Sequence, residues 1–120
     1  MKNKKLLQSF LNAFSGLVYA FRSERNLPLH LAGAAVALAA SFYFKVERFE
    51  LLFVILAIFL VFITEMLNTA VETAVDLKTT EIHPLARIAK NIAAGAVLFA
   101  ALFALVVAYI VFAERLVNIW

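Results

Sequence analysis

An apolar run passes directly into a polar stripe in residues 51–76, LLFVILAIFLVFITEMLNTAVETAVD. No charged residue precedes Glu65 in this stretch, and the polar residues Asn68, Glu72 and Asp76 follow it. Their spacing of three or four residues puts all four side chains on one face of an α-helix. Because a charge near lipid is costly, carboxylates that emerge from a membrane-type helix indicate a functional site.

The composition of the chain indicates an integral membrane protein. Hydrophobic residues make up 65% of its 120 residues, and the mean hydropathy of +0.94 is far above that of a soluble domain. The length predicts one domain, residues 1–120. Cysteine is absent, which excludes a disulfide framework and a thiolate metal site. We expect no nucleic-acid partner, because the basic residues flank apolar segments and form no patch interleaved with aromatic residues.

Three apolar segments, at residues 27–44, 51–71 and 92–112, predict membrane-spanning helices. Residues 3–26 are too polar to span a bilayer, and they predict an amphipathic helix that lies in the membrane surface. The apolar face of this surface helix would carry Leu7, Phe10, Phe14, Val18 and Phe21. The expected fold is an all-α membrane protein with one surface helix and three transmembrane helices.

Lysine and arginine residues predict the orientation of the chain in the membrane. Of the 11 basic residues, only Lys45, Arg48 and Arg115 lie on the side of the first loop and the C-terminus. The others lie before the first span or around the second loop. Because cytoplasmic segments carry the excess of basic residues, we expect the N-terminus in the cytoplasm and the C-terminus outside.

Depth in the membrane divides the polar stripe. At about 1.5 Å per residue, Glu65 lies about 21 Å along the second span and Glu72 about 31 Å, whereas the hydrocarbon layer is about 30 Å thick. Glu65 is therefore expected just inside the cytoplasmic boundary, and Glu72 at or beyond it. Glu24 precedes the first span at the same level, and Lys90 and Asn91 open the third span there.

The residues of this layer suit phosphoryl transfer to a hydroxyl at the membrane surface. The carboxylates of Glu24, Glu72 and Asp76 favour Mg²⁺, which also binds phosphate oxygens. Lys90 suits a phosphate group, since it lies near the N-terminus of a helix. A P-loop is absent, because the three glycines are isolated, so any nucleotide must be held in another way.

Glu65 is the candidate general base toward the hydroxyl, and Asn68 could orient that base or a phosphate oxygen. Several other polar residues also have plain structural interpretations. Asp76 and Glu81 could be solvated residues at a helix end, and His83 could be an ordinary surface residue beside a proline. Lys90 could simply mark the cytoplasmic boundary.

At these residues the sequence resembles the bacterial diacylglycerol kinase family. Residues 65–76 contain Glu-x-x-Asn-Thr-Ala-x-Glu-x-x-x-Asp, and residues 83–97 contain His-Pro-Leu-Ala-x-x-Ala-Lys-x-x-Ala-Ala-Gly-Ala-Val. The segment Phe-Arg-x-Glu-Arg-Asn-x-x-x-His-Leu at residues 21–31 is similar to the Gram-positive branch, whose members phosphorylate undecaprenol. The resemblance covers essentially the whole chain.

The resemblance implies an ATP-dependent lipid kinase of the bacterial cytoplasmic membrane. The family's fold is a homotrimer with composite active sites between subunits. Glu65 would be the catalytic base with Asn68 beside it, and Glu24 and Glu72 would bind the Mg²⁺ that accompanies ATP. The implied nucleotide-binding residues are Lys5, Glu81, His83, Lys90 and Asn91.

Asn91 departs from the family pattern, in which an aspartate follows the lysine. The amide keeps the shape but loses the charge, so we expect weaker nucleotide binding than an aspartate would provide. Undecaprenol is the favoured acceptor, and diacylglycerol is the alternative. Two further alternatives are a family member with weak catalysis and a non-enzymatic, ion-conducting oligomer. Against the latter, residues 51–63 supply no charge to a conduction path.

Overall fold

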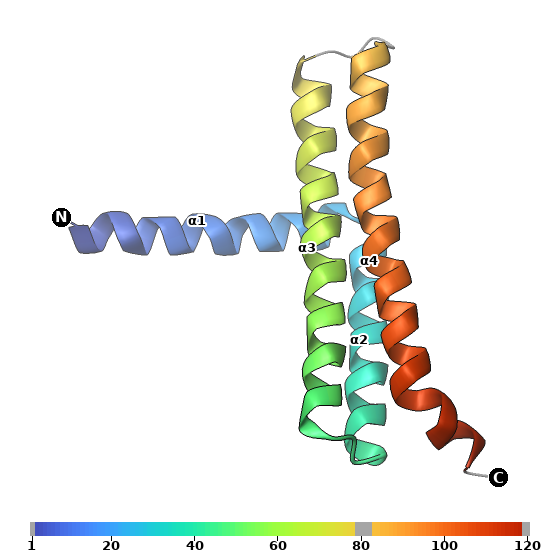
Figure 1. Cartoon of the computed structure of the whole chain (residues 1–120). Helices are drawn as coiled ribbons and strands as arrows, with labels where there is room; N and C mark the ends of the chain where they lie inside the picture. Colours follow the sequence, from blue (N-terminus) through green and yellow to red (C-terminus); the bar gives the residue numbers. More distant parts are fainter. Residues whose placement is uncertain (1, 79–82, 119–120) are drawn as a thin grey trace.

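The computed structural model describes residues 2–78 and 83–118, and this part of the chain is helical throughout apart from short connections (Figure 1). The helices are α1 (Lys2–Ser23), α2 (Asn26–Tyr43), α3 (Arg48–Lys78) and α4 (Pro84–Val117). Of these, α2, α3 and α4 are long and apolar enough to cross a membrane. The prediction of an all-α protein with three such helices is confirmed.

Helices α3 and α4 extend well beyond the predicted spans. The 31 residues of α3 and the 34 residues of α4 correspond to about 46 Å and about 51 Å of helix, against a hydrocarbon layer of about 30 Å. The polar stripe is therefore part of α3, which continues to Lys78. Hydropathy identifies only the part of a helix that suits lipid. Backbone hydrogen bonds can extend the same helix through polar residues, so the helices are longer than the predicted spans.

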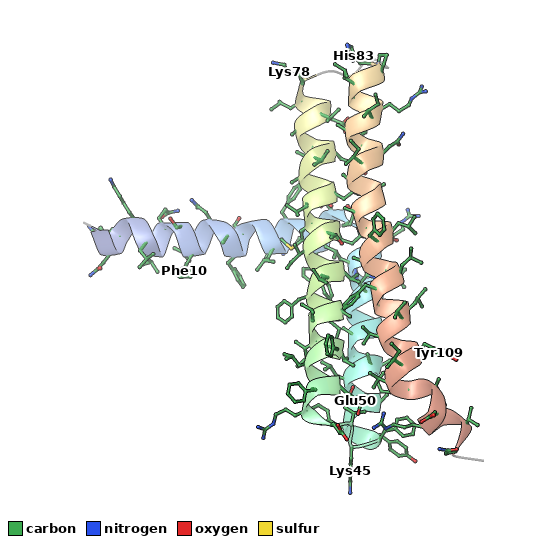
Figure 2. All side chains as sticks on the ribbon, viewed as in Figure 1. Phe10, Lys45, Glu50, Lys78, His83 and Tyr109 are labelled. Atoms are coloured by element: carbon green, nitrogen blue, oxygen red, sulfur yellow. The ribbon has the colours of Figure 1, made fainter. Side chains whose placement is uncertain are left out.

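The molecule has one part in which α2 accompanies α3 and α4, and another part that contains α3 and α4 alone (Figure 1). Helix α1 lies crosswise to the others, and α2 runs beside only one part of α3 and α4. Beyond the level of α1, α3 and α4 continue toward Lys78 and His83 (Figure 2). Phe10, on the predicted apolar face of α1, is 68% exposed, and the membrane-surface position of this helix stays a prediction.

A small core joins α3 to α4. Val54 and Ala57 of α3 pack with Val107 and Val111 of α4. Many large apolar side chains are exposed instead, such as Phe59 at 61%. Extended apolar surfaces of this kind are typical of faces that are covered by lipid or by another subunit.

The connection between α2 and α3 ends α2 with a Schellman motif. Lys45 has a φ of 53°, in the left-handed region, and its N–H donates to the carbonyl of Phe42. The N–H of Val46 donates to the carbonyl of Ser41 at 3.1 Å. These bonds satisfy carbonyl groups that the end of a helix leaves without partners.

Glu50 joins the start of α3 to the end of α4. Its Oε1 accepts a hydrogen bond from the backbone N–H of Glu47 at 3.0 Å, which caps the first turn of α3. Both of its carboxylate oxygens also accept hydrogen bonds from Arg115, each at 2.8 Å. This two-pronged ion pair lies at the opposite end of the helices from Lys78 and His83 (Figure 2).

Candidate active site

Glu65 of α3 is buried, with only 4% of its surface exposed. Its Oε1 lies 3.1 Å from Nε2 of His30, which stands in the first turns of α2. A buried carboxylate needs such a partner, because an unpaired charge away from water is costly. The sequence prediction missed His30, although a lone polar residue at the start of an alanine-rich span was a signal.

An aromatic ring packs against the imidazole of His30. The ring of Phe62 from α3 meets it edge to face, with centroids 6.4 Å apart. Phe62 in turn packs against Phe21 near the end of α1, at 5.9 Å. Leu27, one turn before His30 on α2, is completely buried. The position of the imidazole is therefore set by three helices.

Glu24 lies just after the end of α1 and contacts Thr69 of α3. Its Oε2 accepts a hydrogen bond from Oγ1 of Thr69 at 2.6 Å. Oγ1 of Thr69 also lies 3.1 Å from the backbone carbonyl oxygen of Glu65. Thr69 was not among the predicted site residues, and its place beside Asn68 in the motif was the available signal.

Asn68 contacts Glu72 rather than the Glu65 carboxylate. Its Nδ2 donates to Oε1 of Glu72 at 3.3 Å. The contact that orients Glu65 therefore comes from His30, not from Asn68. Oδ1 of Asn68 is buried and has no hydrogen-bond partner among the described residues. A buried acceptor without a partner is a position that a ligand can satisfy.

Lys90 of α4 forms an ion pair with Asp76 of α3, with 2.8 Å between Nζ and Oδ1. Asp76 is therefore more than the polar end of a helix, since it holds the lysine that the sequence predicts to bind phosphate. Both side chains remain accessible, at 40% and 64% exposure. Along α3, Asp76 lies about 16 Å from Glu65, so the candidate site is elongated.

The other predicted nucleotide-binding residues lie on α1, on α4 and in the connection between α3 and α4. His83 caps α4, where its Nδ1 accepts from the N–H of Leu85 at 3.1 Å and Pro84 occupies the first turn. Asn91 is exposed on α4. Lys5 lies in the first turn of α1, about 28 Å along the helix from Glu24. Glu81 lies outside the described residues.

Glu24 contacts Thr69, and Glu72 contacts Asn68, the residue beside Thr69 on α3. Within the described ranges, no group of three or more metal-binding side chains is arranged to hold a metal ion. Mg²⁺ is commonly held by only one or two carboxylates together with phosphate oxygens and water. The carboxylates of Glu24 and Glu72 therefore suit a metal that arrives with a nucleotide. The buried Oδ1 of Asn68, which has no hydrogen-bond partner among the described residues, belongs to the side chain that contacts Glu72.

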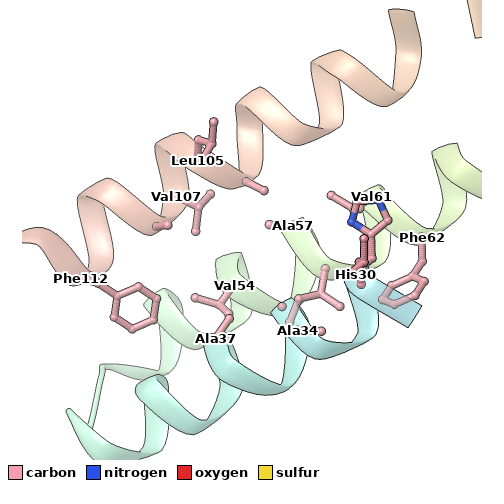
Figure 3. A pocket seen from close by; sticks show the side chains of 15 residues that line it. His30, Ala34, Ala37, Val54, Ala57, Val61, Phe62, Leu105, Val107 and Phe112 are labelled. Carbon is pink, nitrogen blue, oxygen red and sulfur yellow. The ribbon is translucent and has the colours of Figure 1, made fainter. Parts of the chain in front are cut away.

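An apolar cavity of about 260 Å³ lies between α2, α3 and α4. His30 and Phe62 stand at one end of it, and Phe112 stands at the other (Figure 3). Between them the lining is almost entirely aliphatic, including Ala37, Val54 and Ala57. The cavity thus links the imidazole that holds Glu65 to the apolar middle of the helices.

Comparison with known proteins gives a consistent result. Residues 11–112 match the family described as prokaryotic diacylglycerol kinase. The chain is 37% identical over 112 residues to the undecaprenol kinase of Bacillus subtilis, which covers 93% of this chain and 91% of that protein. It is 46% identical over 104 residues to a diacylglycerol kinase of Synechocystis, covering 85% of this chain but 59% of that longer relative. A diacylglycerol kinase of Helicobacter pylori is 31% identical over 100 residues, covering 83% and 78% of the two chains.

Proposed function

This chain belongs to the prokaryotic diacylglycerol kinase family and is a membrane lipid kinase, and we propose that its acceptor is undecaprenol. As a kinase of this family it transfers a phosphoryl group from ATP to a lipid, a reaction that usually needs a divalent metal. The similarity to an undecaprenol kinase over nearly the full length of both chains supports this acceptor. Diacylglycerol, the substrate named in the other relatives, is the alternative.

One observation carries the proposed chemistry. Glu65 is a buried carboxylate whose histidine partner lines an apolar cavity, and Thr69 connects the backbone of Glu65 to Glu24. A lipid alcohol could therefore keep its tail in apolar surroundings while its hydroxyl approaches Glu65. Nucleotide phosphates could approach the same hydroxyl from the side of Glu24 and Glu72.

The proposed reaction follows from these positions. Glu65 would take the proton of the lipid hydroxyl while that oxygen forms a bond to the γ-phosphorus of ATP. The bond between this phosphorus and the β–γ bridging oxygen would break, and ADP would leave. Lys90 would hold phosphate oxygens. Mg²⁺, held by Glu24 and Glu72, would supply positive charge that stabilises the phosphoryl group during transfer.

We further propose that residues 1–120 form a single domain in a bacterial cytoplasmic membrane, with the N-terminus inside and the C-terminus outside. The distribution of basic residues supports this orientation. With α1 in the cytoplasmic surface, the ends of α3 and α4 that carry Asp76 and Lys90 would project into the cytoplasm. The resemblance to the family supports a homotrimer, in which other subunits and lipid would cover the exposed apolar faces. In a site shared between subunits, Lys5 could contact a nucleotide that another copy binds.

A competition assay tests the proposed acceptor. The purified protein is offered ATP with labelled γ-phosphate, together with equal amounts of undecaprenol and diacylglycerol in mixed micelles. We expect label mainly in undecaprenyl phosphate. Label mainly in phosphatidic acid would establish the alternative acceptor. Label in neither lipid would favour a weak or non-enzymatic family member.

A further inference from the structure

We propose that His30 is a positioning residue for phosphoryl transfer, which holds Oε1 of Glu65 so that the second carboxylate oxygen faces the lipid hydroxyl. The proposal rests on the proposed role of Glu65 as the base. His30 itself would neither take the proton from the substrate nor touch the nucleotide. Its contribution would be to keep the base in the geometry that the reaction needs.

The geometry of the pair supports this role. The two residues lie 35 positions apart in the sequence and on different helices, with 3.1 Å between Nε2 and Oε1. The Glu65 side chain is 6% exposed and that of His30 is 32% exposed. No described lysine or arginine forms an ion pair with Glu65. The nearest other titratable residue in the hydrogen-bond network is Glu24, which connects to the Glu65 backbone through Thr69.

The proposed role of Glu65 implies which group holds the proton between the two residues. A carboxylate that is to accept the substrate's proton has to be ionised and then only accepts hydrogen bonds, so in this role Nε2 of His30 is the donor. One such bond restrains a glutamate side chain that otherwise has several rotatable bonds. Because it occupies Oε1, it leaves Oε2 as the oxygen available to the substrate. A neutral imidazole can do this without adding a permanent charge at the membrane edge.

The surroundings of His30 explain how the imidazole can hold the base. Phe62 packs edge to face against the imidazole, and His30 also lines the end of the apolar cavity (Figure 3). The aromatic contact restrains the ring that orients Glu65. A lipid whose tail occupied this cavity would bring its hydroxyl past His30 to reach Glu65. The histidine therefore lies where it could align the base with the incoming hydroxyl.

The test compares His30→Gln with His30→Leu in the full-length protein, with undecaprenol and ATP as substrates. Glutamine can present an N–H to Oε1, whereas leucine fills the space without a donor. We expect His30→Leu to lower kcat by roughly 10- to 100-fold with little change in the KM for ATP, and His30→Gln to recover most of kcat. Thr64→Val is the matched control, since among the described residues its hydroxyl bonds only to the carbonyls of Leu60 and Val61. The kcat of this variant should stay within about 2-fold of wild type.

The outcomes separate this inference from the proposed function. A wild-type protein that phosphorylates neither lipid refutes the function itself. An active wild type together with a His30→Leu variant of normal kcat overturns the role of His30. If His30→Leu does not fold, as judged by thermal unfolding in detergent, the test instead compares the activities of His30→Gln and His30→Asn. The shorter asparagine should then be much less active than glutamine, and equal activities would overturn the proposal.

Discussion

Oγ1 of Thr69 lies 2.6 Å from Oε2 of Glu24, a contact that joins residues 45 positions apart. The same hydroxyl lies 3.1 Å from the carbonyl oxygen of Glu65, one turn earlier on α3. Because a hydroxyl has one proton, the two acceptors share it or compete for it. Thr69 thus connects the carboxylate proposed to bind metal with the helical turn that carries the proposed base.

Thr69→Val should weaken the use of metal more than the use of lipid. Without the hydroxyl, Glu24 loses its contact with α3 and has to be ordered when the metal binds. We expect the Mg²⁺ concentration for half-maximal activity to rise by about 3- to 10-fold, which corresponds to the net contribution of one ordinary hydrogen bond, about 0.5–1.5 kcal/mol. Thr69→Ser keeps the hydroxyl and should resemble wild type. Identical Mg²⁺ titrations for the valine and serine variants would contradict this role.

Glu65→Gln should abolish turnover in a folded protein. The amide has the size of the carboxylate but cannot take a proton from the substrate, so we expect kcat to fall by at least about 10²-fold. Thermal unfolding in detergent, compared with wild type, checks that the variant is folded. Near-normal activity of a folded Glu65→Gln protein would refute its assignment as the base.

Asp76→Asn should affect ATP rather than the lipid. The change removes the charge that holds Nζ of Lys90 at 2.8 Å, so the lysine would be less well placed for phosphate. We expect the KM for ATP to rise several-fold, while the KM for lipid stays the same. Thermal stability should hardly change, because exposed ion pairs contribute little to stability. Glu114→Gln, at the other end of α4, is the control for loss of a carboxylate, and an equal effect there would count against the Lys90 interpretation.

Asn91→Asp should strengthen nucleotide binding. Asn91 is exposed beside Lys90 on α4, and an aspartate there would restore a charge that could order the lysine or accept a hydrogen bond from the nucleotide. Equilibrium binding of ATP to the wild type and to Asn91→Asp tests this prediction, and the variant should have the higher affinity. Equal affinities would show that the hydrogen-bonding shape of the amide is sufficient.

Lys45→Gly should stabilise the protein without changing its activity. Lys45 has a φ of 53°, and this left-handed conformation costs a residue with a side chain about 1–2 kcal/mol. Glycine adopts it freely, although glycine also gains freedom in the unfolded chain. We expect a net gain of about 0.5–1 kcal/mol, seen as a higher midpoint of thermal unfolding in detergent. Lys45→Ala keeps the side-chain penalty and should show no such gain.

Part of the candidate site could be predicted from the sequence because helical periodicity is a local property. Glu65, Asn68 and Glu72 fall on one face of a helix whatever packs against it, and the Asn68–Glu72 hydrogen bond is of this local kind. The contact between Thr69 and Glu24 could not be predicted, because it depends on where the end of α1 meets α3. The histidine partner of Glu65 was missed for the same reason.

The sequence alone determined the class of the protein, its three apolar helices and the polar stripe of α3. These follow from hydropathy and from the geometry of a single helix, which need no knowledge of neighbours. Only the tertiary structure decided the partners that Glu24, Glu65 and Lys90 have on other helices. His30 meets Glu65, Thr69 meets Glu24, and Asp76 meets Lys90. Hydrogen bonds act over about 3 Å, and only the packing of helices brings groups so distant in sequence within that range.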